Sequence, residues 1–162
     1  MSKCRKIVLY NPTAVFWTMP LGLIAIGSAL DPAQYEVEIV DARLEENPLS
    51  SLLTEARGAL CVGMGVLTGE PIRDALGAAR ALKKEHPNIP VVWGGWHPSL
   101  FPAECLEENS VDVVVSGQGE VTFAELVERY SQGGDLHDIA GLTWKDTDGQ
   151  IVQNQPRPTI DV

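Results

Sequence analysis

The sequence is poor in basic residues and has no long uninterrupted apolar segment. It contains 12 Lys and Arg against 22 Asp and Glu, a formal net charge of −10 at pH 7. A field of that sign repels phosphate backbones and anionic lipid, so neither nucleic acid nor a membrane surface is an expected partner. The longest apolar stretch, residues 19–30, contains Pro20 and is too short to span a bilayer. The N-terminus lacks the apolar core and cleavage site of a signal peptide, so we expect a cytoplasmic protein.

Cysteine is also scarce, and its pattern excludes two classes of small domain. The three cysteines, Cys4, Cys61 and Cys105, are odd in number and share no CxxC or Cys/His spacing. That pattern argues against a disulfide framework and against a zinc site. We expect reduced thiols, and Cys61, inside an apolar run, should behave as a small buried hydrophobic residue.

What is present is the composition and pattern of one α/β domain. Hydrophobic residues make up 44% and charged residues 21% of the 162 residues, as in soluble globular proteins. Short β-branched runs alternate with helical stretches, which is typical of βαβ units and a parallel sheet covered on both faces. We predict strands at residues 6–10, 36–40, 59–66, 91–94 and 112–116, and helices at 21–30, 49–57, 70–86, 103–108 and 120–132. The fold class is therefore a doubly wound five-stranded parallel sheet, Rossmann-like or flavodoxin-like.

The last residues have a different pattern. Residues 142–145 and 150–153 flank an Asp-Gly turn and predict a β-hairpin. Residues 154–158, Asn-Gln-Pro-Arg-Pro, are extended and polar, which is typical of a linker. We expect a ligand-binding domain over residues 1–140, followed at 141–162 by the hairpin and a linker toward a further domain.

Ligands of doubly wound folds bind at the carboxyl ends of the strands, so the loops there are candidate sites. The first such loop, residues 11–22, contains Pro12, Val15, Phe16 and Trp17. It lacks the GxGxxG of a dinucleotide site and the Ser/Thr/Gly-rich phosphate loop of a flavodoxin. A large, flat, mostly apolar ligand suits this loop better than a phosphate does. Alternatively, Phe16 and Trp17 fold back onto the core or meet a neighbouring domain.

Three glycine-containing loops follow the later strands. Gly65, Leu67, Thr68 and Gly69 follow the third strand, and Thr68 can cap the next helix or donate a hydrogen bond. After the fourth strand, Gly94 and Gly95 clear side chains from a space beside His97, which either contacts a ligand or is structural. After the fifth strand come Gly117, Gly119 and Glu120, and Glu120 can cap the exposed N–H groups of a helix start. The alternative for each loop is a glycine-rich turn or a capped helix start with no ligand.

Taken together, these loops resemble the cobalamin-binding domain at the front of many cobalamin-dependent radical S-adenosylmethionine enzymes, including the anaerobic magnesium-protoporphyrin monomethyl ester cyclase type. The resemblance covers nearly the whole chain. It is carried by Asn11-Pro12, Pro20-Leu21-Gly22, Asp41, Gly63-x-Gly65-x-Leu67-Thr68-Gly69, Gly94-Gly95-x-His97-Pro98, Gly117-x-Gly119-Glu120-x-Thr122-Phe123 and Gly141-Leu142-Thr143-Trp144. It implies cobalamin as cofactor and a cofactor-binding set of Pro12, Val15, Phe16, Trp17, Gly65, Leu67, Thr68, Gly69, Gly94, Gly95, His97, Gly117, Gly119 and Glu120.

Two departures from the general cobalamin-binding pattern bear on how cobalamin would be held. Cobalamin domains share a Ser-x-Leu element followed by Gly-Gly, and here Gly65 replaces the Ser, which loses a hydrogen bond of about 0.5–1.5 kcal/mol. The Asp-x-His-x-x-Gly motif that supplies a histidine to cobalt is absent, and the first loop contains no histidine. The resemblance therefore implies a base-off form with no histidine ligand, with residues 15–19 as candidates for the lower face of the ring.

The catalytic half of such an enzyme is not encoded in this sequence. Radical chemistry needs a CxxxCxxC run to hold a 4Fe–4S cluster, and the sequence has none. S-adenosylmethionine and the cluster are therefore expected in a C-terminal radical domain or a partner subunit, and this chain alone is not expected to be catalytic. The parent enzyme would perform methyl transfer or a related radical modification.

Three other hypotheses remain. A flavodoxin-like or receiver-like interaction domain binds no cofactor, but a receiver needs acidic residues where Asn11 and Gly63 stand. A stand-alone corrinoid carrier would deliver methyl groups to a partner, and the missing cobalt-binding histidine counts against it. A degenerate family member would have lost cobalamin binding, in keeping with the departures at Gly65 and Gln118.

Overall fold

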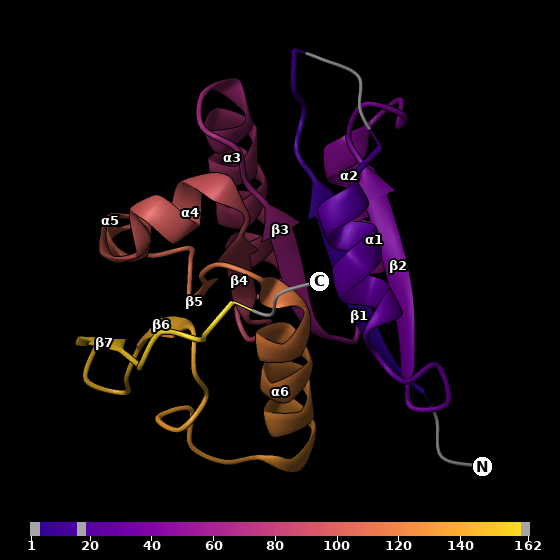
Figure 1. Cartoon of the computed structure of the whole chain (residues 1–162). Coiled ribbons are helices and arrows are strands. Elements are labelled where there is room, and N and C mark those ends of the chain that lie inside the picture. The colour runs from indigo at the N-terminus through magenta and orange to yellow at the C-terminus, as the bar shows by residue number, and fades with distance from the viewer. Residues whose placement is uncertain (1–3, 16–18, 160–162) are drawn as a thin grey trace.

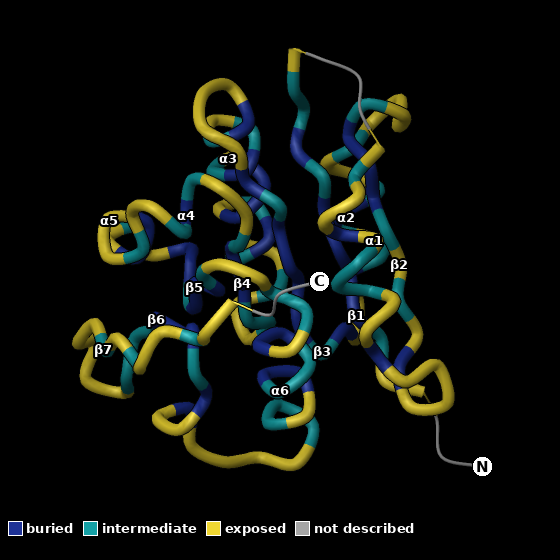
Figure 2. The backbone as a smooth tube through the Cα atoms, viewed as in Figure 1, coloured by how far each residue is buried: buried dark blue, intermediate teal, exposed yellow. Residues whose placement is uncertain are grey.

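Side-chain alternation along the strands decides how the sheet is covered. The structure, a computed structural model, describes residues 4–15 and 19–159. In β1 (Arg5–Asn11), Ile7 and Leu9 belong to one buried cluster, whereas Val8 and Tyr10 belong to another. Because neighbouring residues of a strand point to opposite faces, the sheet has an apolar core on each side. Figure 2 shows the buried strands between exposed helix surfaces.

The sheet has seven strands in the order β2-β1-β3-β4-β5-β6-β7 (Figure 1). Strands β1 to β5 are parallel, and β6 and β7 pair antiparallel at the edge beside β5. The remaining strands are β2 (Tyr35–Asp41), β3 (Ala59–Gly65), β4 (Val91–Gly94), β5 (Val113–Val115), β6 (Leu142–Lys145) and β7 (Ile151–Gln153). The helices are α1 (Leu21–Ser28), α2 (Pro48–Glu55), α3 (Glu70–Glu85), α4 (Trp96–Leu100), α5 (Pro102–Glu107) and α6 (Gly119–Gln132).

The helices divide between the two faces of the sheet. Leu23 of α1 and Phe123 of α6 pack in the cluster that contains Leu9. Helices α2, α3 and α5 contribute Leu52, Ala75 and neighbouring apolar residues to the opposite cluster. The chain therefore leaves β1 toward one face and β3 toward the other, although these strands are neighbours. Such a topological switch point opens a crevice at the carboxyl ends of the two strands.

The structure confirms the predicted fold class, with boundaries that differ by one or two residues. Pro71 lies in the first turn of α3 as predicted, and Cys61 is fully buried, which raises the pKa of its thiol to about 12. One element was not predicted: α4 is a short helix directly after Gly95, in a segment where Gly and Pro indicated a loop. No helix in the described parts of the chain is long and apolar enough to span a membrane.

The predicted hairpin is confirmed as β6 and β7, and it extends the main sheet because β6 pairs with β5. The segment after it is anchored. The Asn154 side-chain nitrogen donates to the carbonyl oxygens of Leu136 and Ile139 at 2.6 and 2.8 Å. Arg157 Nε donates to Thr122 Oγ1 of α6 at 2.7 Å, and the guanidinium also pairs with Glu125. The polar segment expected to be a linker therefore lies fixed against α6 up to Arg157.

A buried ion pair lies at the carboxyl end of β2. The Asp41 and Arg43 side chains are only 8% and 7% exposed, and Arg43 Nη2 lies 2.6 Å from Asp41 Oδ2. Arg43 Nε and the Arg43 backbone N–H donate to Asp41 Oδ1 at 2.9 and 3.1 Å. These hydrogen bonds stabilise the ionised carboxylate and hold the pKa of Asp41 below its ordinary value.

The Asp41→Asn variant should be less stable than wild type in a pH-dependent way. A depressed carboxyl pKa in the folded state contributes stability that is complete above the unfolded pKa of about 3.9 and is lost as pH falls through the folded pKa. We predict a loss of about 3 kcal/mol in the free energy of unfolding at pH 7, because Arg43 is left buried beside a neutral group. Urea unfolding should show that the difference shrinks below about pH 4. If wild type and Asp41→Asn differed equally in the free energy of unfolding at pH 7 and pH 3, the difference would not come from the Asp41–Arg43 ion pair.

Candidate functional site

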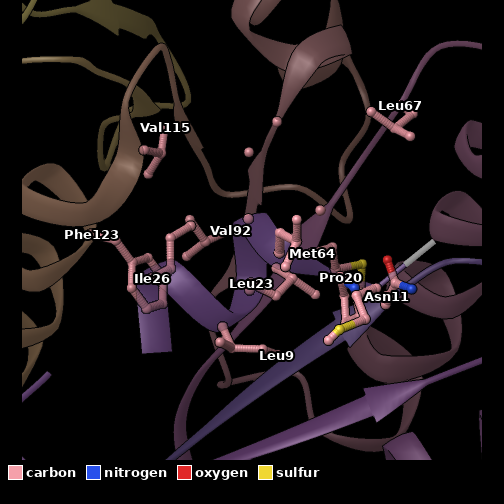
Figure 3. A pocket seen from close by; sticks show the side chains of 17 residues that line it. Leu9, Asn11, Pro20, Leu23, Ile26, Met64, Leu67, Val92, Val115 and Phe123 are labelled. Carbon is pink, nitrogen blue, oxygen red and sulfur yellow. The ribbon is translucent and has the colours of Figure 1, made fainter. Parts of the chain in front are cut away.

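The crevice at the switch point contains a cavity of about 280 Å³. It lies under α1 and α6 at the carboxyl halves of the central strands (Figure 3). Its walls are mainly apolar, and from the strands they include Leu9, Gly63, Gly65, Val92, Gly94 and Val115. From the helices and the loops before them come Met19, Pro20, Leu23, Ile26 and Phe123.

Three glycines occupy the cavity-facing side of two central strands. On β3 the residues after Cys61 on this face are Gly63 and Gly65, and on β4 Val92 is followed by Gly94. A Cβ atom at Gly63 would lie 2.9 Å from Leu9 Cδ2, and one at Gly65 would lie 3.2 Å from Leu23 Cδ2. These two glycines therefore let apolar side chains pack down onto the sheet.

Gly94 has a different environment. A Cβ atom there would meet nothing closer than the Val115 carbonyl oxygen at 3.6 Å and Val115 Cβ at 3.8 Å. A Cβ at Gly94 would therefore make only ordinary van der Waals contacts, and Gly94 itself lines the cavity. A small side chain could begin at this position without a close contact at its Cβ atom, and it would then face the cavity.

Four of the predicted site residues line the cavity: Gly65, Leu67, Gly94 and Gly95. Thr68 and His97 lie beside them: Thr68 Oγ1 is 3.3 Å from His97 Nδ1, and the His97 ring is tilted against the Phe101 ring with centroids 5.3 Å apart. Thr68 is therefore not the cap of α3. The N-cap position of that helix is Gly69, with φ of 107°.

The predicted residues after β5 lie at the start of α6. Gly119 allows a close helix approach, since a Cβ atom there would lie 3.3 Å from Ile26 Cδ1 and 3.4 Å from Val115 Cγ1. Glu120 lies in the first turn of α6, where its charge is favourable near the helix N-terminus. Gly117 precedes the helix with φ of 76°. None of the three lines the cavity, but Gly119 lies directly against Ile26 and Val115, which do.

The first loop reaches the cavity only in part among the residues the structure describes. Pro12 is buried, whereas Val15 is 83% exposed and Met19, which lines the cavity, is 64% exposed. Phe16 and Trp17, two predicted site residues, lie outside the described residues. The loop is anchored at its start, where the Thr13 backbone N–H donates to Asp74 Oδ2 at 2.8 Å.

Sequence reasoning missed the helical side of the cavity. Leu23, Ile26 and Phe123 are ordinary apolar helix residues, and nothing in their spacing separates a cavity wall from a core. Gly63 was recognised in the motif but not placed in the site. The signal was available, because Gly63 and Gly65 are two residues apart and must therefore lie on one face of a strand.

Hydrogen bonds tie together the three loops at the mouth of the cavity. The Val66 N–H donates to the Gly94 carbonyl at 2.8 Å, and the His97 N–H donates to the Val66 carbonyl at 3.1 Å. Ser99 Oγ donates to the Gly95 carbonyl at 2.7 Å and accepts from the Gly117 N–H at 2.9 Å. The loops after β3, β4 and β5 are therefore held at fixed spacing.

Comparison with known proteins identifies a family. The model of the B12 binding domain family matches residues 8–127. An uncharacterized methyltransferase of Pyrococcus horikoshii is 33% identical over 144 residues, which cover 87% of this chain and 31% of that protein. The anaerobic magnesium-protoporphyrin IX monomethyl ester cyclase of Synechocystis is 32% identical, with 87% and 29% covered.

Solved structures agree with this result. The radical S-adenosylmethionine methyltransferase TsrM from Kitasatospora setae, with cobalamin and a 4Fe–4S cluster bound, superposes with a TM-score of 0.76 at 28% identity, covering 98% of this chain and 30% of TsrM. OxsB, a cobalamin-dependent S-adenosylmethionine radical enzyme with aqua-cobalamin and S-adenosylmethionine bound, gives a TM-score of 0.81 at 18% identity, covering 97% and 23%, which shows the fold alone. The chain spans about 30% of the length of the curated relatives it matches.

The Ser99→Ala variant should loosen the mouth of the cavity. Without the hydroxyl, the Gly117 N–H loses its acceptor, so its hydrogen exchange measured by NMR should accelerate about tenfold. Ser99→Thr should restore slow exchange. Ser28→Ala is a matched control, because Ser28 Oγ donates only locally to Ala25 on α1. Unchanged Gly117 exchange in Ser99→Ala would show that this hydrogen bond does not hold the loops together.

Proposed function

The chain belongs to the B12-binding domain family, and from this premise we propose that it binds cobalamin base-off, with the nucleotide tail inside the cavity under α1 and α6. The observation that carries the proposal is the apolar cavity of about 280 Å³ lined by Gly94, where a Cβ would have no contact closer than 3.6 Å. The cavity walls supply apolar contact for a flat base, and the open mouth lies at the carboxyl edge of the sheet.

The dimensions of the cavity suit one part of the cofactor. A volume of about 280 Å³ is at the lower end of small-molecule sites, which run from roughly 300 to 1,000 Å³. It can take a two-ring base and not a whole corrin ring, so the ring would lie outside, across the mouth. Leu67 and Met19, 39% and 64% exposed, lie at the mouth and offer apolar surface to such a ring.

The base-off form follows from this placement. A base held above Gly94 cannot at the same time coordinate cobalt on the ring outside. Of the three histidines, His86 Nε2 is 3.0 Å from the Leu53 carbonyl oxygen, and His137 makes an edge-to-face contact with Trp144 of β6. His97, at the carboxyl edge, contacts Thr68 and Phe101. We propose that this chain supplies no histidine ligand and that Val15 and Met19 face the lower side of the ring; residues 16–18, the other candidates for this face, lie outside the described residues.

The residues of the chain would bind and orient the cofactor for chemistry that takes place elsewhere. When bound, cobalamin supplies a cobalt centre that accepts and donates a methyl group, and the absence of a strong lower ligand favours its reduced, low-coordinate form. Ser99, Gly95 and Gly117 hold the loops under the ring in a fixed arrangement, so the chain would present one open face of the cofactor.

The matched relatives suggest the larger context. We propose that the chain is the cofactor module of a radical S-adenosylmethionine methyltransferase or cyclase. S-adenosylmethionine and a 4Fe–4S cluster would be held by a C-terminal radical domain or a partner subunit. The carboxyl edge, where the cavity opens, is the face that such a domain would have to approach.

Titration with hydroxocobalamin tests the placement of the tail. Wild type should give a saturable change to the base-off absorbance spectrum, and Gly94→Val should weaken binding at least tenfold because its methyl groups fill the cavity. Its Cβ meets nothing closer than 3.6 Å, so circular dichroism should remain unchanged.

Gly77→Val on α3, where a Cβ has no neighbour within 4 Å, is the matched control and should bind as wild type does. Gly95→Val is a poor test, because φ of 96° and a Cβ 3.1 Å from the Val66 carbonyl oxygen would strain the backbone. Full binding by a folded Gly94→Val would place the tail elsewhere. No spectral change with wild type at large excess would indicate a degenerate domain.

Substitution of the histidine at the carboxyl edge tests the ligand set. Since His97 is not expected to reach cobalt, His97→Phe should leave the absorbance maxima of the bound cofactor unchanged. Affinity should fall only severalfold, through loss of the contact with Thr68. A shift of the maxima on substitution would identify His97 as a cobalt ligand and contradict the proposed coordination.

A further inference from the structure

Asn11 is the polar exception in an apolar cavity. Among the described residues that line the cavity, Asn11 alone has a side chain with nitrogen or oxygen. It is the last residue of β1 and is half-buried. An amide at the edge of an apolar site fixes the orientation of a ligand more than it adds to affinity.

The amide of Asn11 is held in one orientation by β2. Asn11 pairs with Asp41 in the β1–β2 register, and its side chain hydrogen-bonds to the Asp41 carboxylate. An ionised carboxylate only accepts hydrogen bonds, so the amide nitrogen must be the end that faces Asp41. Arg43 holds Asp41 in turn through two side-chain hydrogen bonds of 2.9 and 2.6 Å.

The carbonyl end of the amide is therefore left for the cavity. In Figure 3 the nitrogen of Asn11 lies on the side away from Leu23 and Val115, and the oxygen lies nearer to them. The mouth of the cavity thus presents one oriented hydrogen-bond acceptor, with the negative charge of Asp41 behind it. A ligand group at this position must donate, because a carboxylate there would face an acceptor and a like charge.

We propose that Asn11 Oδ1 accepts a hydrogen bond from an N–H or O–H donor of the bound corrinoid, and that the Asp41–Arg43 pair acts as the positioning element that keeps this acceptor in place. The inference rests on the proposed function and adds a specificity to it: the site selects corrinoids that have a donor at this point. Two groups of cobalamin fit, a side-chain amide of the corrin ring and a hydroxyl of the nucleotide ribose.

Two ligands and two variants test the proposal. Hydroxocobalamin and cobinamide, which keeps the ring amides and lacks the nucleotide, are each titrated by absorbance and by calorimetry into wild type, Asn11→Leu and Asn11→Thr. Leu removes the acceptor at similar volume. Thr keeps a donor for Asp41, which guards against a variant that merely fails to fold. Asn88→Leu, at an exposed position before β4, is the matched control.

The expected result is a loss of about tenfold in affinity for Asn11→Leu, a smaller loss for Asn11→Thr, whose hydroxyl can still accept, and none for Asn88→Leu. An equal loss for both ligands assigns the donor to a ring amide, and a loss for hydroxocobalamin alone assigns it to the nucleotide. Unchanged affinity for both ligands in a folded Asn11→Leu, which has no acceptor, would overturn the role of Asn11 while leaving cobalamin binding intact. Failure of wild type to bind either ligand would instead remove the proposed function.

Discussion

The site depends on the placement of glycines at inward-facing positions of the sheet. In a parallel sheet covered on both faces, each inward position normally carries a branched apolar residue, as Val92 and Val115 do here. At Gly63, Gly65 and Gly94 the side chain is absent, all on the face under α1 and α6. An apolar cavity of this kind reduces stability, by about 24 cal/mol per Å³ in core substitutions, so it persists only where rigid elements hold its walls apart. The continuous sheet and the close α1–α6 approach at Gly119 provide that rigidity.

Apart from the Asn11 amide, the polar side chains discussed around the cavity bond to partners outside it. Asp41 and Arg43 pair at the end of β2, and Ser99 bridges the loops after β4 and β5. Since these groups are already bonded to one another, they do not compete for the apolar interior, and a ligand meets a site whose shape is set beforehand. Such preorganisation lowers the entropic cost of binding. The domain would act as a rigid holder for its ligand.

Much of this arrangement was predictable from the sequence. The β-branched runs identified the five parallel strands, and the Asp-Gly turn identified the hairpin. The paired glycines indicated where the backbone at the carboxyl edge of the sheet is not covered by its own side chains. The resemblance to cobalamin domains, carried by motifs such as Gly94-Gly95-x-His97-Pro98, agrees with the family match over residues 8–127. The domain boundary at residue 140 and the cofactor-binding residues stay predictions.

Contacts between distant segments were not predictable. Residues 154–157 look like a linker in composition, yet Asn154 and Arg157 bond to residues that only the fold brings near. Thr68 has the local signature of a cap, but its partner is His97 on another loop. The glycine at position 65, in place of the Ser of other cobalamin domains, has a physical reason visible only in three dimensions. A side chain there would meet Leu23 at about 3.2 Å, so Leu23 and a residue larger than glycine compete for one space.

The most direct test is an NMR measurement of methyl groups in the presence of hydroxocobalamin. If the glycine-lined cavity holds the nucleotide base, the aromatic protons of the base should show nuclear Overhauser contacts to the methyl groups of Leu23, Val92 and Val115. Val114, which points to the opposite face of the same strand, should show none. Bound cofactor without contacts to Leu23, Val92 or Val115 would contradict the account.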